Sequence, residues 1–218
     1  MFAVTNRHNL DLAFKDHAWL GYKFEAFKIS GYSDNEHYYE TIPRSLARFI
    51  FAANSGEDVA VFDLTDGQMQ YLRRRKPAEA PGTVVGPPAL FSAEIDMLAT
   101  DDDLRRLAPG AQILMPSYSL HYDRSSERPV MRGGIVSSDP ASDYQTEGQE
   151  PARRVLLQVQ SASGASGAPV FAQLDAEAVL LGVNAGQLLI GGLPSGFSYC
   201  FKAQCIRECI QNLIALRG

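Results

Sequence analysis

The sequence predicts an all-β protein, either a sandwich or a pair of barrels, that ends in one α-helix. Short runs of β-branched and apolar residues recur along the 218 residues, and turns containing glycine or proline separate them. Residues 202–216 instead show helical spacing, because Ile206, Ile210, Leu213 and Ile214 fall on one apolar stripe. Hydrophobic residues make up 45% of the chain, which is ordinary for a globular protein.

The first half contains four predicted strands. Residues 19–29 alternate in polarity, with Leu20, Tyr22 and Phe24 on one face, so we expect a half-buried strand there. The other three are short apolar runs over residues 2–5, 48–53 and 58–62.

Residues 72–88 have the composition of a linker. A basic run at residues 73–76 (Arg-Arg-Arg-Lys) is followed by several prolines and glycines. Because the whole chain is acidic, a solvated loop explains this run better than a nucleic-acid patch, and the run could also be a cleavage-prone site. Residues 92–107 then predict a helix or helical turns, with Ser92 as N-cap and Pro109-Gly110 at the end.

The second half is again rich in predicted strands, which cover residues 112–115, 129–137, 154–160, 168–174, 178–183 and 197–201. Residues 139–151 are polar and punctuated by glycine and proline, so we expect a surface loop there.

Charge and composition limit the classes of partner and cofactor. A net charge of −5 gives no electrostatic reason to expect nucleic acid or an anionic membrane. No apolar run approaches the roughly 20 residues of a membrane span, and no signal peptide is recognisable. We therefore expect a cytoplasmic protein, provided that Met1 is the true start. We interpret Cys200, Cys205 and Cys209 as buried free thiols rather than a zinc site, and we expect no metal or cofactor.

The stretch from Ser163 to Phe171 is the clearest candidate for chemistry. Small residues fill it from Ala162 to Ala168, and an apolar run follows. Such a turn lets backbone N–H groups crowd around one exposed hydroxyl. A serine held there could attack a carbonyl carbon if a base took its proton and the N–H groups held the oxyanion. The alternative is an ordinary small-residue turn between two strands.

The order of residues decides which serine-hydrolase arrangement is available. All four histidines, His8, His17, His37 and His121, precede Ser166, so the order Ser, acid, His of the α/β-hydrolases is excluded. The order His, Asp, Ser stays open. His8 follows a short apolar run, and Asp58 opens another, with His121 and Asp63 as rival candidates.

With these motifs the chain resembles the trypsin-like, chymotrypsin-fold serine peptidases, most closely the bacterial branch. Val4-Thr5-Asn6-Arg7-His8 resembles the segment that carries the family's histidine, and Asp58-Val59-Ala60-Val61 resembles the segment of its aspartate. Gly164-Ala165-Ser166-Gly167-Ala168-Pro169 resembles the serine motif, with Ala168 where the family usually has glycine. The stretches at residues 134–136 and 181–186 and the terminal helix also fall where the family has them.

The resemblance implies two antiparallel barrels of the six-stranded type followed by a C-terminal helix. Residues 1–105 would form the first barrel, with a linker at about 72–110, and residues 106–218 the second barrel, with the helix at about 202–216. His8 would be the general base, Asp58 would orient it, and Ser166 would be the nucleophile. The backbone N–H groups of Gly164 and Ser166 would form the oxyanion hole. The residues expected to line the specificity pocket are Gln160, Ser161, Ala162, Asn184, Ala185 and Gly186. The absence of charge at Gln160 favours a small, apolar or polar substrate side chain over Arg or Lys.

Two departures from the family pattern bear on function. Only seven residues precede His8, where the family has two or more strands, so either the first barrel is incomplete at its N-terminus or the true start of translation lies upstream. An incomplete barrel would leave an open strand edge that a partner chain or segment could complete. Ala165 stands where zymogens of the family carry an aspartate, so we expect no activation by an ion pair with a new N-terminus. The function predicted is a serine endopeptidase acting on peptides or proteins. The alternatives are an inactive peptide-binding or scaffold module of the same fold, and an esterase-like hydrolase with the same triad.

Overall fold

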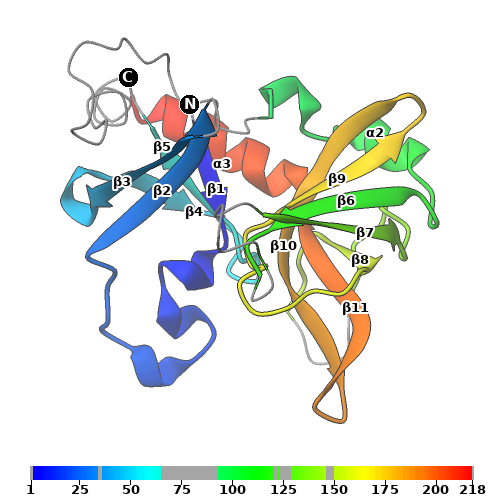
Figure 1. The fold of residues 1–218 in the computed structure, drawn as a ribbon, viewed down its shortest axis with the longest axis horizontal. Helices are drawn as coiled ribbons and strands as arrows, with labels where there is room; N and C mark the ends of the chain where they lie inside the picture. Colours follow the sequence, from blue (N-terminus) through cyan, green and yellow to red (C-terminus); the bar gives the residue numbers. More distant parts are fainter. Residues whose placement is uncertain are drawn as a thin grey trace.

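A closed barrel of antiparallel strands makes up the second half of the chain (Figure 1). The computed structural model describes residues 2–33, 36–64, 93–119, 122, 129–145 and 150–217. The strands join in the order β10-β11-β8-β7-β6-β9. Their bounds are β6 Gln112–Ser117, β7 Val130–Val136, β8 Arg154–Gln158, β9 Pro169–Leu174, β10 Glu177–Ile190 and β11 Leu193–Lys202. All six strands predicted for this half are present, and the predicted all-β class is confirmed.

The last two strands extend well beyond the predicted ranges. Ile190 pairs with Leu193 across a two-residue loop formed by Gly191 and Gly192, which have φ of 59° and 82°. Positive φ at both central residues defines a type I′ hairpin turn, which glycine accommodates without steric cost. The Gly-Gly pair therefore closes β10 and β11 into a long hairpin. The sequence did not indicate this length, because the residues before Gly191 do not alternate between apolar and polar.

The first half forms a three-stranded sheet and a separate hairpin. The sheet has the order β1-β5-β4, with β1 Phe2–Thr5, β4 Arg48–Phe51 and β5 Ala60–Asp63. The hairpin pairs β2 Ala26–Ser33 with β3 Glu36–Pro43, and β3 was not predicted. Within the described ranges this half contains no second closed barrel.

The strand predicted from residue 19 is wrong over residues 19–25. The chain there follows 3-10 turns at Arg7–Asn9, Leu12–Phe14 and His17–Trp19, and Leu20 and Tyr22 are exposed. Phe24 alone of the alternating set joins a cluster of aromatic rings, beside Phe49 with ring centroids 5.3 Å apart. The prediction failed because an alternation of apolar and polar residues does not show whether a neighbouring strand is present to pair with the segment.

Two α-helices lie within the described part of the chain. The short α2, Asp101–Arg106, begins after its N-cap Thr100, which forms a reciprocal capping box with Asp103. With the 3-10 turn at Ile95–Met97 it confirms the helical turns predicted within residues 92–107, although they do not form one continuous helix. Ser92 and the basic run at residues 73–76 lie outside the described residues. The terminal α3, Ala203–Ala215, confirms the prediction and packs against β4, β5 and β10.

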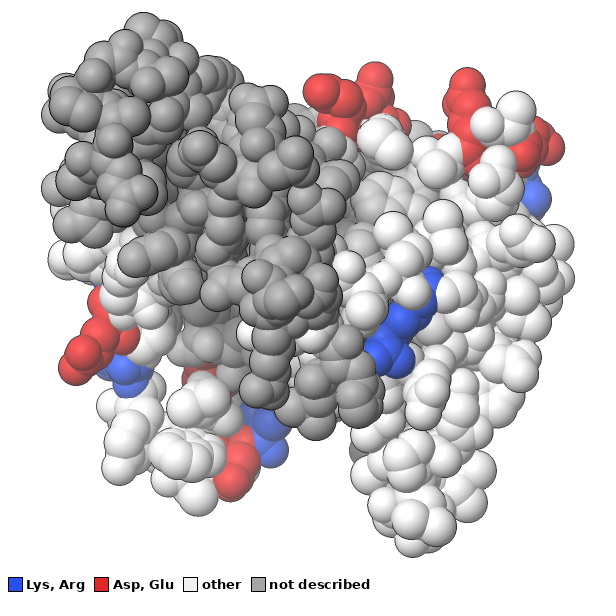
Figure 2. All heavy atoms as spheres, viewed as in Figure 1, with Lys and Arg blue, Asp and Glu red and all other residues white. Residues whose placement is uncertain are grey.

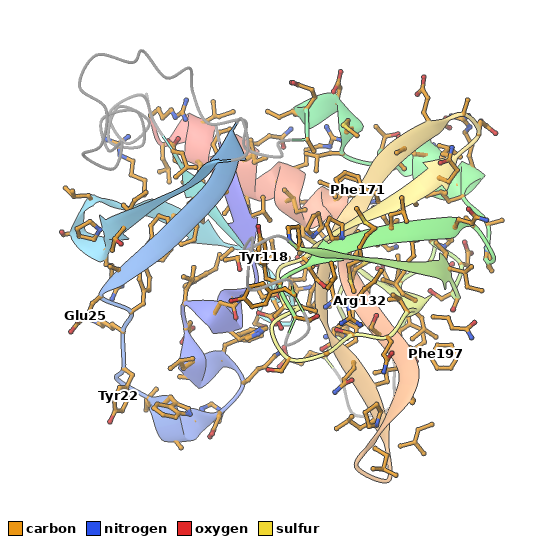
Figure 3. The ribbon with its side chains drawn as sticks, viewed as in Figure 1. Tyr22, Glu25, Tyr118, Arg132, Phe171 and Phe197 are labelled. Atoms are coloured by element: carbon orange, nitrogen blue, oxygen red, sulfur yellow. The ribbon has the colours of Figure 1, made fainter. Side chains whose placement is uncertain are left out.

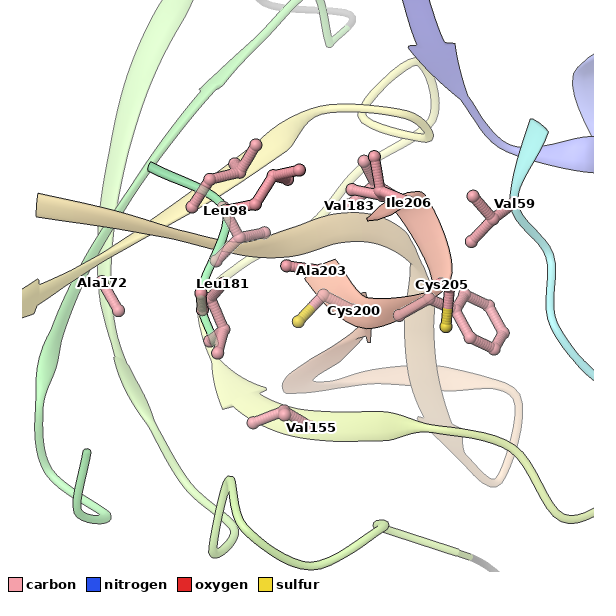
Figure 4. Close-up of a cluster of buried hydrophobic side chains, with 14 of the residues drawn as sticks. Val59, Leu98, Val155, Ala172, Leu181, Val183, Cys200, Ala203, Cys205 and Ile206 are labelled. Atoms are coloured by element: carbon pink, nitrogen blue, oxygen red, sulfur yellow. The ribbon is translucent and has the colours of Figure 1, made fainter. Parts of the chain in front are cut away.

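One apolar core joins the two halves. Val59 of the first half shares it with Val155, Cys200, Cys205 and Ile206 of the second (Figure 4). All three cysteines are buried and free, as predicted. Since β5 lies under α3, the loop that carries Asp58 is fixed relative to the barrel that carries Ser166.

An ion-pair network adds a second connection. Glu57 is fully buried, and Arg153 donates to both of its carboxylate oxygens at 2.7 Å. Arg153 also bonds to Glu208 of α3 at 2.5 and 2.8 Å. The bonds to Glu57, and then those to Glu208, raise the pKa of the Arg153 guanidinium, and Arg153 lowers the pKa of the Glu208 carboxyl. These bonds hold the buried Glu57 carboxylate in place, and Glu57 directly precedes Asp58 in the chain.

Candidate active site

His8 and Asp58 meet at one end of the first sheet. Thr5, the last residue of β1, pairs with Ala60, the first residue of β5, so the segments beyond this pair lie side by side. The Asp58 carboxylate accepts a bond from the backbone N–H of His8 at 2.8 Å, and its second oxygen lies 2.5 Å from His8 Nδ1. The side chain of Asn6 donates to the Asp58 carbonyl at 2.8 Å. The imidazole is therefore oriented through Nδ1, which leaves Nε2 for proton transfer.

Charge is concentrated around this pair. Asp58 is almost fully buried, and the Lys15 ammonium lies 3.5 Å from the carboxylate oxygen that contacts His8. Lys15 also donates to the Ala185 carbonyl at 3.2 Å, which joins the 3-10 segment after His8 to β10. Burial raises the pKa of the Tyr199 phenol; the positive charge of Arg154 lowers it, and the negative charge of Asp58 adds a smaller upward shift.

Ser166 lies between two tight turns. Ala165 N–H donates to the Ala162 carbonyl at 2.9 Å across a four-residue turn whose third residue, Gly164, has φ of 86°. These features define a type II turn, in which positive φ at the third position favours glycine. Within the described chain, neither Gly164 N–H nor Ser166 N–H donates to a protein acceptor. The N–H groups of Gly164 and Ser166 are thus without a protein acceptor in the described chain, and Ser166 is partly exposed.

The serine segment touches the segment that carries His8. A Cβ placed on Gly167, which has φ of 83°, would lie 2.7 Å from Thr5 Oγ1 and 3.4 Å from Thr5 Cα. Only glycine allows this approach, and Thr5 is three residues from His8. No hydrogen bond joins Ser166 Oγ to His8 in the described structure; such bonds in free enzymes often tighten only when substrate binds.

The two segments predicted to form the specificity pocket lie side by side. The buried Asn184 side chain donates to Ser161 Oγ at 3.1 Å and to the Ala165 carbonyl at 2.9 Å. Ala185 is fully buried, whereas Gly186 is partly exposed. Gln160 has an exposed side chain, and Ala162 supplies the carbonyl of the type II turn.

Two residues that the sequence did not indicate support the serine segment. Arg132 donates from Nη1 to the Gln160 carbonyl at 2.8 Å and from Nη2 to Ser119 Oγ at 2.6 Å. A Cβ on Gly164 would meet the Tyr118 carbonyl at 2.7 Å, so the chain after β6 lies directly against the type II turn. Figure 3 shows Tyr118 where the barrel faces the first half, with Arg132 on the neighbouring strand β7. No local sequence signal marks either residue, because both contacts are tertiary.

The rival residues have other surroundings. Asp63 is buried and forms an ion pair with Arg217. His17 lies in a 3-10 turn and His37 in β3, and His121 lies outside the described residues.

Other features of the surface do not coincide with this site. Over the part of the chain that the structure describes, no cluster of His, Cys, Asp or Glu could hold a metal ion. A cavity of about 400 Å³ lies over β6, β7 and β9, lined among others by Leu114, Ile135 and Phe171, and none of the predicted site residues contributes to it. None of the described helices has the length and apolar character that crossing a membrane requires.

Comparison with known proteins identifies the fold. No family model and no curated protein matches the sequence. Among solved structures, the HtrA-type protease AlgW with a decapeptide is 17% identical, with a TM-score of 0.54 over 98% of this chain and 48% of that one. Deg5 is 14% identical, with the same TM-score over 98% of this chain and 78% of that one. The chain thus spans about half the length of AlgW. It has the fold of the trypsin-like serine peptidases, as the sequence motifs predicted.

Proposed function

We propose that this chain is a serine endopeptidase in which Ser166, His8 and Asp58 act as the catalytic triad. The observation that carries the proposal is the His8–Asp58 pair, held by two hydrogen bonds and brought against the Ser166 segment through Gly167 and Thr5. A buried carboxylate that fixes the imidazole beside a serine in a glycine-rich turn is the arrangement that acyl transfer requires.

Each residue then has a defined step. His8 Nε2 takes the proton of Ser166 Oγ as the oxygen attacks the carbonyl carbon of the peptide bond. Asp58 stabilises the imidazolium, which next protonates the leaving amine. Water, deprotonated by His8, releases the acyl group and regenerates the serine. No metal or organic cofactor takes part in these steps.

The free N–H groups of Gly164 and Ser166 support a role as oxyanion donors. Removing one such donor typically costs about 10²–10³ in rate. Ala165 is fully buried between them and carries no charge, so we propose that the turn is held without the ion pair used by zymogens of this fold. Arg132 and the Tyr118 carbonyl, which contact this segment, take over part of that support.

A peptide ligand is supported by the comparison, because AlgW is described with a bound decapeptide. We propose the exposed part of β10 after Asn184, together with residues 160–162, as the start of the substrate site. Because the Gln160 side chain is uncharged, we propose that the site prefers small, apolar or polar substrate side chains next to the scissile bond. The Arg132 guanidinium donates to the backbone carbonyl of Gln160.

The test is hydrolysis of a quenched fluorescent peptide library by the purified chain. Cleavage by the wild type, lost in Ser166→Ala and His8→Ala but kept in Ser163→Ala, is the expected result. Ser163 is the matched control because it is an exposed serine in the same turn. Cleavage that persists in Ser166→Ala contradicts the proposal, and so does a folded wild type that cleaves no peptide.

The second candidate is a peptide-binding module without turnover. Two observations favour it: no hydrogen bond joins Ser166 to His8 in the described structure, and the described first half forms no closed barrel. The same library assay separates the two functions. An esterase would be recognised by turnover of simple esters without turnover of peptides.

A further inference from the structure

Lys15 lies where the first half of the chain meets the barrel. It follows the 3-10 turn Leu12–Phe14, and its backbone N–H donates to the Leu12 carbonyl at 3.4 Å. Its ammonium lies 3.5 Å from Asp58 Oδ2 and donates to the Ala185 carbonyl at 3.2 Å. One side chain therefore contacts both the loop that carries Asp58 and strand β10 of the barrel.

The two carboxylate oxygens of Asp58 have different partners. Oδ1 accepts from the backbone N–H of His8 at 2.8 Å, whereas Oδ2 lies 2.5 Å from His8 Nδ1 and 3.5 Å from the Lys15 ammonium. The Asp58 side chain is only 3% exposed, so water supplies few of the hydrogen bonds that a carboxylate requires. Among the ion pairs of the described residues, Lys15 is the one Lys or Arg that contacts Asp58. The oxygen that orients the imidazole is therefore also the oxygen that faces Lys15.

The Ala185 carbonyl is available to Lys15 because the pairing of β10 is interrupted there. The register between β10 and β11 shifts between Asn184 and Gly186, so Ala185, which lies between them, has no partner residue in β11. Such a shift is typical of a β-bulge, which leaves one residue outside the ladder. Ala185 is fully buried, and a buried carbonyl requires a donor. The Lys15 ammonium supplies one.

Solvent limits the range over which the charge of Lys15 acts. Its side chain is 45% exposed, so the field of the ammonium is screened beyond the groups that it contacts. The coloured Lys and Arg side chains on the face drawn in Figure 2 are scattered rather than gathered in one patch, so no basic cluster on that face adds to this charge. We therefore expect Lys15 to act through its two direct contacts.

We propose that Lys15 is a positioning residue for the His8–Asp58 pair. Its ammonium connects the Asp58 carboxylate to the Ala185 carbonyl of the barrel, and this connection fixes the direction of the imidazole. The proposal deepens the proposed function and rests on it, because the direction of the imidazole matters for proton transfer from Ser166. In this role Lys15 exchanges no proton and touches no substrate.

The first test is the proton NMR spectrum of the purified chain, which does not depend on turnover. A proton in a short bond between an imidazole nitrogen and a carboxylate resonates far downfield, so His8 Nδ1–H should give such a signal, and His8→Ala should lack it. In Lys15→Met we expect the signal to shift and to exchange with water about tenfold faster, since Asp58 loses a fixed partner. An unchanged signal in Lys15→Met overturns the proposal, and so does a wild type without the signal.

Labelling of Ser166 by a fluorophosphonate gives the second test. Lys15→Met should react about tenfold more slowly than the wild type. This loss is smaller than the hundredfold that a shift of about 1 Å can cost, because the His8 backbone N–H still holds the other Asp58 oxygen. Lys23→Met is the matched control, because Lys23 is an exposed lysine a short distance along the chain, and it should label at the wild-type rate. A wild-type rate in Lys15→Met overturns the proposal.

Chemical rescue separates the ammonium from the bulk of the side chain. Lys15→Cys places a thiol at a half-exposed position, whereas the three native cysteines are buried, so an alkylating reagent should react there first. Bromoethylamine rebuilds a side chain with its ammonium as many bonds from the backbone as in lysine, and iodoethane adds the same two carbons without the nitrogen. We expect the first product to recover most of the labelling rate and the second to recover none. Equal rates for the two products contradict a role of the ammonium.

Peptide hydrolysis separates this proposal from the proposed function. With a peptide that the wild type cleaves, Lys15→Met should lower kcat about tenfold and leave KM within about twofold, because the imidazole rather than the substrate is displaced. A rise in KM at constant kcat would mean that Lys15 binds substrate, and the proposal would be wrong. If the wild type neither labels nor cleaves, the proposed function fails, and the NMR comparison with Lys15→Met by itself decides whether Lys15 holds the His8–Asp58 pair.

Discussion

Replacing Gly167 with alanine tests how closely the two halves meet at the candidate active site. With φ of 83°, Gly167 lies in the left-handed region, where a residue with a Cβ costs about 1–2 kcal/mol. The new Cβ would also lie 2.7 Å from Thr5 Oγ1, closer than carbon and oxygen can approach without a bond. The Thr5 side chain must then turn or move, and its bond from Asn9 Nδ2, 2.9 Å long, is lost.

The consequence for chemistry follows from the distance along the chain. Thr5 ends β1 three residues before His8, so a shift of β1 moves the imidazole relative to Ser166. A displacement of about 1 Å can cost about a hundredfold in rate. We therefore expect Gly167→Ala to react about a hundredfold more slowly with a fluorophosphonate, which modifies activated serines, and to unfold with a free energy lower by about 2 kcal/mol.

Gly110→Ala is the control for backbone strain. Gly110 has φ of 95° and nothing within 4 Å of its added Cβ, so the variant should lose similar stability but keep its labelling rate. Adding Thr5→Ala to Gly167→Ala removes the clashing oxygen and should recover part of the rate. If Gly167→Ala reacts with the fluorophosphonate as fast as Gly110→Ala does, the contact between Gly167 and Thr5 does not position His8 beside Ser166, and the reasoning is refuted.

Three further predictions concern the buried polar groups. Asp58→Asn keeps a hydrogen-bonding side chain but favours the wrong imidazole tautomer, so labelling of Ser166 should fall about 10⁴-fold with little loss of helical circular dichroism; a fall below tenfold would argue against Asp58 as the orienting group. Arg153→Met leaves the Glu57 carboxylate buried without its cation, so chemical denaturation should show a free energy of unfolding lower by about 3–5 kcal/mol. An unchanged denaturation midpoint would mean that the ion-pair network does not form in solution. Burial raises the pKa of Cys200 to about 12 and that of Cys209 to about 11, so both thiols stay protonated at pH 8. A thiol reagent should therefore modify them only after unfolding, and rapid modification of the folded protein at pH 8 would contradict their burial.

Local patterns in the sequence predicted most of the strands and the candidate residues of the proposed triad. β6 to β9 follow short apolar runs bounded by turns, and the helical stripe of α3 packs on β4 and β5. His8 and Asp58 were identified because each adjoins a short apolar run, and the structure brings them into hydrogen-bond contact. Ser166 was identified from the small residues around it, and Gly164 and Gly167 do have positive φ.

Contacts between distant segments were not predictable in this way. Lys15 beside Asp58 and Arg132 beside Gln160 each connect positions far apart in the chain, and neither stands in a recognisable motif. The stretch after His17 alternates in polarity as a strand does, but Leu20 finds no neighbouring strand and stays exposed. The lengths of β10 and β11 were underestimated. The apolar residues at their far ends are exposed, so the length of these strands depends on hairpin pairing and on the Gly-Gly turn.

The most direct test of the assembled triad is to locate the fluorophosphonate adduct by peptide mass spectrometry. The account predicts one adduct per chain, on Ser166, formed by the wild type and absent from His8→Ala. An adduct on Ser163 or another serine, or one that forms equally well without His8, would contradict it.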